Sequence, residues 1–174
     1  SIFGGSAVFC ILNPRAGREL EANVRKTAKP KRVMVAGGGP AGMEFALTAA
    51  QAGHDVTLYE KEDSLGGQIN LAKASPGKAD LGRITDSMRG RMKRYGVKVE
   101  LGSALTAESI EKEKPDVLAV ASGGRPLDIS VSGIDKPHLH CAWDVLMERV
   151  PDIGKNVVIV GISSKPASWA SSCR

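Results

Sequence analysis

The chain has 174 residues, of which 42% are hydrophobic and 25% charged, and its formal net charge is +5. This composition is close to the average of soluble globular proteins, so a buried core is expected rather than disorder. No apolar run approaches the roughly 20 residues that cross a bilayer. Three widely spaced cysteines, Cys10, Cys141 and Cys173, exclude a disulfide scaffold and a CxxC redox centre, so we expect a reducing, cytoplasmic setting.

The first 29 residues have no clean hydrophobic period, and NPRAGRE within them is typical of a turn. The apolar opening lacks a basic leader and an initiator Met, so we expect a start inside a longer protein rather than a signal peptide. RVMVA, at 32–36, predicts a buried parallel strand, Ala41–Ala52 a helix that Gly53 ends, and DVTLYE a second strand. This series is a βαβ unit.

A loop rich in Gly, Lys and Pro, LGGQINLAKASPGK at 65–78, is expected next. The following pattern predicts alternating helices and strands: a helix at 80–95, a strand at 97–101, a helix at 107–114, a strand at 116–122, a helix at 142–149 and a last strand at 155–161. Alternation of this kind predicts an α/β fold with a doubly wound, mostly parallel, Rossmann-like sheet, incomplete in this chain.

The densest basic group lies within the predicted helix at 80–95. No aromatic platform and no recognition motif accompanies it, so we interpret it as a solvated helix face and expect no nucleic-acid partner. Its members are Arg83, Arg89, Arg91, Lys93 and Arg94.

The stretch GGGPAG contains the pattern G-x-G-x-x-G between a predicted strand and a predicted helix. Gly37 permits the tight turn, Gly39 lets a pyrophosphate approach the backbone, and Gly42 lets the helix pack closely on the sheet. Pro40 and Ala41 lie where the loop meets the predicted helix and are further candidates for cofactor binding, because a helix N-terminus favours phosphate. Glu60, 18 residues after Gly42, is placed to accept the hydroxyls of a ribose, with Lys61 beside it.

Two further segments favour FAD over NAD as the dinucleotide. Gly66, Gly67 and Gln68 follow the second strand, where FAD-binding folds place a loop near the pyrophosphate and the ribityl chain. The segment ASGGRP, which includes Ala121, Ser122 and Gly123, resembles the stretch that returns past the flavin nucleotide. Taken singly, each segment is also compatible with ordinary turn glycines that bind no ligand.

The runs CILNPRAGRE, GGGPAGMEFA, AGHDVTLYEK, LGGQINLAK and PDVLAVASGGRP together resemble one flavoprotein group over residues 3–161. These are the iron–sulfur flavoproteins related to old yellow enzyme, such as 2,4-dienoyl-CoA reductase, trimethylamine dehydrogenase and NADH:flavin oxidoreductases. The resemblance implies an FAD- or ADP-binding portion of an oxidoreductase in which electrons pass from NAD(P)H through FAD and a [4Fe–4S] cluster to FMN and an unsaturated substrate.

The resemblance also implies a domain division. Residues 1–29 would lead in from an iron–sulfur and barrel portion, 30–150 would form the FAD- or ADP-binding domain, and 151–174 would hold the first strand of an NAD-binding domain. Cys10 matches the fourth cluster ligand of an intact parent. The second glycine motif expected after KNVVIVG is replaced by ISSKPASWASSCR, so we expect a truncated chain whose barrel and NAD-binding domains are its missing partners.

Three alternatives remain open for the isolated chain: a lobe that binds FAD, a module that holds ADP without redox chemistry, and a truncated chain that holds no ligand tightly. We assign no catalytic residue, because in such enzymes the flavin carries the redox chemistry. His138 and His140 lie near Cys141 in a predicted loop without a second ligand cluster, so we expect no metal site there.

Overall fold

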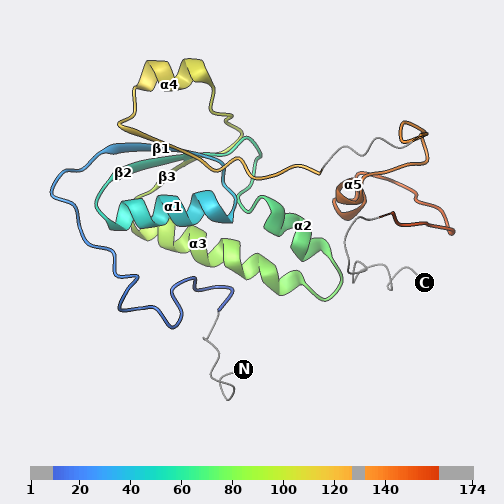
Figure 1. Ribbon diagram of the computed structural model, residues 1–174, viewed down its shortest axis with the longest axis horizontal. Coiled ribbons are helices and arrows are strands. Elements are labelled where there is room, and N and C mark those ends of the chain that lie inside the picture. Colours follow the sequence, from blue (N-terminus) through green and yellow to red (C-terminus); the bar gives the residue numbers. More distant parts are fainter. Residues whose placement is uncertain (1–9, 127–131, 161–174) are drawn as a thin grey trace.

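The computed structural model describes residues 10–126 and 132–160 (Figure 1). Four parallel strands form its sheet in the order β3-β2-β1-β4, and they are β1 (Arg32–Ala36), β2 (Asp55–Tyr59), β3 (Lys98–Glu100) and β4 (Val117–Val120). The central strand β1 pairs with β2 on one side and with β4 on the other. All four strands were predicted from the sequence to within two residues.

Helices lie on both faces of this sheet. Figure 1 shows α1 (Pro40–Gln51) and α3 (Gly82–Arg94) together on one face, with α4 (Ala107–Glu113) on the opposite face. The connection through α4 carries the chain from β3 at one edge of the sheet to β4 at the other. The predicted doubly wound α/β class is therefore confirmed.

The core lies between the sheet and the pair α1 and α3. Alternate residues of β1 and β2, such as Val35 and Leu58, point into it, as the two-residue period of a strand requires. The helices contribute side chains at helical spacing, among them Met43 and Leu47 from α1 and Met92 from α3, and all five are essentially inaccessible. Burial of this apolar face holds the glycine loop that joins β1 to α1 in place.

The lead-in segment, residues 10–29 of the described chain, contacts side chains of α1. The guanidinium of Arg15 donates from Nη2 to Oε1 of Gln51 (2.8 Å) and to Oγ1 of Thr48 (3.3 Å), and it lies 3.6 Å from Oε1 of Glu44. The predicted turn around Arg15 is present, with the amide of Arg18 donating to the carbonyl of Arg15. The amide of Thr27 also donates to the carbonyl of Ala52 at the end of α1 (2.8 Å). Residues 10–29 are thus held against α1 by side-chain and backbone contacts, and they form no strand or helix of their own.

The helix α4 is fixed to the sheet by Tyr59. The phenol of Tyr59 donates to the carboxylate of Glu113, whose oxygens lie 3.0 and 3.1 Å away. Burial, followed by the hydrogen bond to Glu113, raises the pKa of Tyr59 from 10.0 to about 12. The folded chain therefore holds this proton more tightly than the unfolded chain does.

A pH dependence follows from the raised pKa of Tyr59. The stabilisation that the protonated phenol of Tyr59 gives the folded chain is complete below pH 10. It disappears as the pH rises through about 12. We expect the urea midpoint of the unmodified chain to fall more steeply between pH 10 and 12 than that of Tyr59→Phe, which lacks the titrating hydroxyl. Parallel pH profiles of the two proteins would contradict this expectation.

The expected loop at 65–78 is wrong, because its middle forms the helix α2 (Gln68–Ala74). The glycines and the proline that suggested a loop lie at its two ends, and QINLAKA between them contains no helix breaker. Ile69 of this helix packs against the core. The expected helix at 80–95 is confirmed, since a short 3₁₀ turn, η2 (Ala79–Leu81), leads directly into α3.

The expected strand at 155–161 is also wrong as far as the described residues 155–160 are concerned, and Gly161 lies outside them. No strand of the described chain pairs with this segment, and the side chain of Val158 is 88% exposed. An apolar run without a pairing partner cannot satisfy its backbone as a strand. The helix expected at 142–149 is present but shorter, as α5 (Ala142–Leu146).

The described part of the chain contains no helix that is long and apolar enough to cross a membrane. The tail ISSKPASWASSCR and the opening residues 1–9 lie outside the described residues, as does the segment 127–131.

Candidate functional site

The glycine loop lies at the carboxyl end of the central strand. Gly37 follows β1 with φ of +114°, which L side chains rarely adopt, and a Cβ there would overlap the carbonyl of Ala121. A Cβ on Gly42, in the first turn of α1, would overlap the carbonyl of Gly37. These two glycines therefore let β1, α1 and the segment after β4 approach one another.

Gly39 differs from both of these glycines. A Cβ at Gly39 would have no atom within 4 Å, and its φ of −73° is ordinary. The side of the loop at Gly39 is therefore open, as the approach of a ligand to the backbone requires. A Cβ on Gly67 would come within 3.1 Å of the Cα of Gly39, so the second glycine segment borders the same place.

The N-terminus of α1 adjoins this open side. Gly39 is its N-cap in an extended conformation, no side chain caps it, and its first turn contains no acidic residue. Pro40 has no N–H, while the amides of Ala41 and Gly42 have no intrahelical partner. The free amides and the positive end of a 12-residue helix suit a negatively charged group, as in a pyrophosphate.

Glu60 lies beneath the loop, immediately after β2, and only 7% of it is exposed. Its Oε2 accepts a hydrogen bond from the amide of Gly38 (2.6 Å), and its Oε1 accepts one from the amide of Glu62 (3.0 Å). Each carboxylate oxygen has two lone pairs, so acceptor capacity remains for ribose hydroxyls. The carboxylate of Glu60 therefore also holds the backbone of the glycine loop in place. Its spacing from the glycines in the sequence did not predict this structural role.

The three predicted segments meet at this edge of the sheet. The amide of Gly66 donates to the carbonyl of Gly38 (2.9 Å), and Nε2 of Gln68 donates to the carbonyl of Gly124 (3.3 Å). The amide of Ala121 donates in turn to the carbonyl of Ala36 (2.8 Å). Residues from the ends of β1, β2 and β4 thus surround the open side of Gly39.

The other predicted site residues lie on the exposed part of the same edge. Lys61 is exposed, and its Nζ lies 3.4 Å from Oε1 of Glu62. Ser122 and Gly123 follow β4 and are exposed, and Gly123 has a φ of +76°. The loops after β1 and β4 leave the sheet where the strand order reverses, and ligands of open α/β sheets bind at this position.

Two residues of this region were not predicted. Gly38 occupies one of the unspecified positions in the glycine pattern, yet a Cβ there would meet Cδ2 of Leu65 at 2.5 Å and Oε2 of Glu60 at 3.0 Å. Leu65 is buried against it. The available signal for Gly38 was its place in the middle of three consecutive glycines, whereas nothing in the sequence indicated the contact with Leu65.

Cys10 is an exposed free cysteine in the described chain. Its role as a cluster ligand concerns a longer protein and stays a prediction. His54 accepts a hydrogen bond at Nδ1 from the amide of Lys31 (3.1 Å). This contact joins the residue before β1 to the turn before β2.

Comparison with known proteins places this site in a family context. The family model described as pyridine nucleotide-disulphide oxidoreductase matches residues 31–172. An NADH oxidase of Thermoanaerobacter brockii is 40% identical over 164 residues, which are 92% of this chain and 25% of that protein. A cinnamate reductase of Clostridium sporogenes is 37% identical over 167 residues, 94% of this chain and 25% of that protein.

Two solved structures of redox enzymes are also similar to this chain. A 2-naphthoyl-CoA reductase in complex with 2-naphthoyl-CoA aligns with a TM-score of 0.76 and 40% identity, over 81% of this chain and 22% of the other. A 6-hydroxypseudooxynicotine amine oxidase from Pseudomonas geniculata aligns with a TM-score of 0.73 and 29% identity, over 86% and 25% respectively. The chain spans about a quarter of the length of the relatives that it matches.

Proposed function

Because the chain belongs to the pyridine nucleotide-disulphide oxidoreductase family, we propose that residues 30–150 form the FAD-binding lobe of an NAD(P)H-dependent flavin oxidoreductase. The resemblance to flavoproteins related to old yellow enzyme is confirmed by the relatives, which include an alkene reductase/demethylase of that group. This chain contains no CxxC pair, so we favour flavin reductase chemistry over dithiol chemistry.

The observation that carries the proposal is the convergence of three segments around the open side of Gly39. A site for ADP alone needs the glycine loop and Glu60. The contact of Gln68 with Gly124 adds two more segments to the same edge, beyond the parts that an ADP site needs. We therefore favour FAD over ADP as the ligand.

In this proposal each part of the site has a binding task. The amides of Ala41 and Gly42 hold the pyrophosphate at the start of α1, where the helix dipole favours its charge. Glu60 accepts the ribose hydroxyls with its remaining lone pairs while it holds the loop through Gly38. Bound FAD would supply the electron transfer from NAD(P)H, and the residues of this lobe orient it.

The longer protein would contain the remaining redox groups. We propose that Cys10 serves there as the fourth ligand of a [4Fe–4S] cluster, that FMN is held by a barrel domain, and that residues 151–174 belong to the beginning of an NAD-binding domain. Apolar side chains suited to contact with such domains are exposed at Val120 (71%) and within the run Val157–Val160.

A titration of the purified chain with FAD tests the proposal. We expect a flavin absorbance band that stays with the protein through gel filtration and that excess ADP displaces, because both ligands would occupy the open side of Gly39. Binding of ADP without flavin would support the inert-nucleotide alternative. Failure of both ligands to bind a folded chain would overturn the assignment of this lobe as a binding unit.

A further inference from the structure

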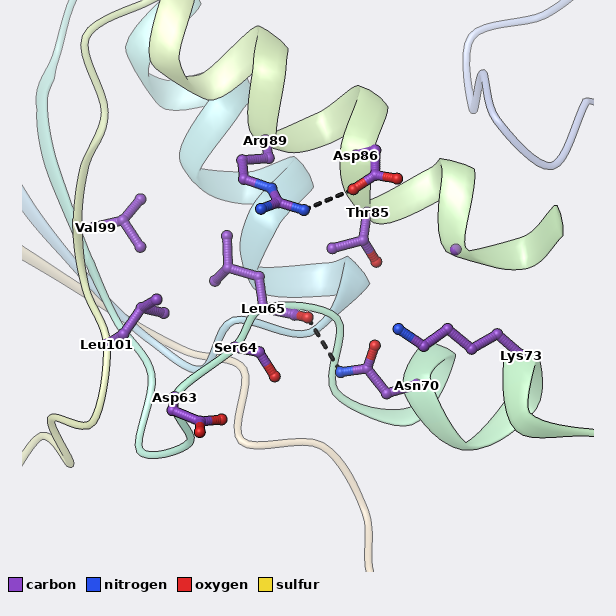
Figure 2. Close-up of a pocket in the computed structure, with 11 residues that line it drawn as sticks. Asp63, Ser64, Leu65, Asn70, Lys73, Thr85, Asp86, Arg89, Val99 and Leu101 are labelled. Atoms are coloured by element: carbon purple, nitrogen blue, oxygen red, sulfur yellow. Dashed lines mark hydrogen bonds and ion pairs between the residues drawn. The ribbon is translucent and has the colours of Figure 1, made fainter. Parts of the chain in front are cut away.

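A cavity of about 400 Å³ lies beside the proposed nucleotide site and is not lined by the glycine loop. Figure 2 shows it between the segment that precedes α2, the helix α2 itself, the beginning of α3 and the end of β3. Leu65 lines its inner wall and at the same time packs beneath Gly38. The family resemblance assigned no role to this space.

Thr85 of α3 is the most informative residue of the cavity. Only 6% of this residue is exposed, and its Oγ1 is buried without a hydrogen-bond partner in the described part of the chain. In Figure 2 the hydroxyl is directed toward the α2 side chains of Asn70 and Lys73. A buried hydroxyl without a partner is unfavourable, and a ligand in the cavity would supply the missing acceptor.

The charges around Thr85 favour an anionic group. Arg89 donates to Oδ1 of Asp86 (2.6 Å), and these two charges neutralise each other. Lys73 has no ion pair within the described residues, so its ammonium remains available near the hydroxyl of Thr85. Asp63 carries the remaining charge of the lining, and Figure 2 shows it on the far side from Lys73.

The wall opposite Lys73 is apolar. Leu65, Val99 and Leu101 form it, and they offer a surface for a short aliphatic group. We propose that this cavity binds a small carboxylate with a short branched aliphatic part. The carboxylate contacts Lys73 and accepts the hydrogen bond of Thr85, and the aliphatic part packs on the three apolar side chains.

The first experiment is a calorimetric titration of the chain with 3-methylbutanoate, with 3-methylbutanol as the matched probe that lacks the carboxylate. We expect the acid to bind with a dissociation constant on the order of 1 mM and the alcohol to bind at least tenfold more weakly. The titration contains no nucleotide, so its outcome is independent of the flavin proposal. Equal binding of the two probes, or no binding of the acid, would overturn the proposal.

Variants then assign the contacts. Lys73→Met should weaken the binding of 3-methylbutanoate about tenfold, whereas Lys93→Met, an equal charge change on the exposed side of α3, should leave it unchanged. Thr85→Val should weaken binding several-fold without lowering the thermal midpoint, because the hydroxyl has no partner to lose. An unchanged affinity in Lys73→Met, or an equal loss in Lys93→Met, would contradict the assigned site.

Discussion

Gly42→Ala should lower the free energy of unfolding by about 3 kcal/mol or more and abolish nucleotide binding. A Cβ at this position overlaps the carbonyl of Gly37, which is backbone and cannot rotate away. Alanine improves helix propensity by about 1 kcal/mol, but the overlap forces α1 away from β1 and exceeds that gain. Urea denaturation followed by far-UV circular dichroism measures the change.

The matched control is Gly39→Ala, three residues earlier in the same loop. Its Cβ enters open space and its φ is negative, so the expected cost is the poorer N-cap preference of alanine, about 1 kcal/mol or less. The added methyl group occupies the side from which the pyrophosphate approaches, so FAD or ADP affinity should fall at least tenfold. A Gly39→Ala chain that binds nucleotide normally would contradict the placement of the ligand. A Gly42→Ala chain of normal stability would contradict the close packing of α1.

The βαβ unit was predictable because two local signals agreed: alternating or continuous β-branched residues marked the strands, and glycines marked the turn between them. The four parallel strands and the meeting of the loops after β1, β2 and β4 follow from that alternation, since the carboxyl ends of parallel strands share one edge. The local pattern was thus sufficient to predict which residues gather at the site.

Properties that depend on tertiary contacts were not predictable in this way. The helix α2 was not predicted, because Gly66 and Gly67 before it and Pro76 and Gly77 after it make the whole segment resemble a loop. The strand expected at 155–161 has the right composition but no pairing partner among the described residues, and pairing is a property of the sheet rather than of the segment. The buried, unpartnered hydroxyl of Thr85 depends on which helices meet, and no spacing rule indicates it.

Glu60→Ala should destabilise the chain by about 2–4 kcal/mol in the absence of any nucleotide. The carboxylate accepts hydrogen bonds from the amides of Gly38 and Glu62, and each such bond to a charged group contributes about 1.5–3 kcal/mol. Since Glu60 is buried, its removal also leaves the amide of Gly38 without its acceptor. Part of any loss of FAD binding in this variant would therefore come from a disordered loop rather than from a lost ribose contact.

Glu60→Gln separates these two effects. The amide retains one acceptor oxygen but places an NH₂ against the other backbone N–H, so its destabilisation should be about half that of Glu60→Ala. Glu62→Ala is the control. The backbone amide of residue 62 still donates to Glu60 in this variant, and the side chain that is removed is exposed. The free energy of unfolding of this variant should therefore change by less than about 0.5 kcal/mol. Urea denaturation of the three variants without ligand measures the structural role. Equal stabilities of Glu60→Ala and the unmodified chain would show that the carboxylate does not hold the loop, and its contribution would then belong to ligand binding alone.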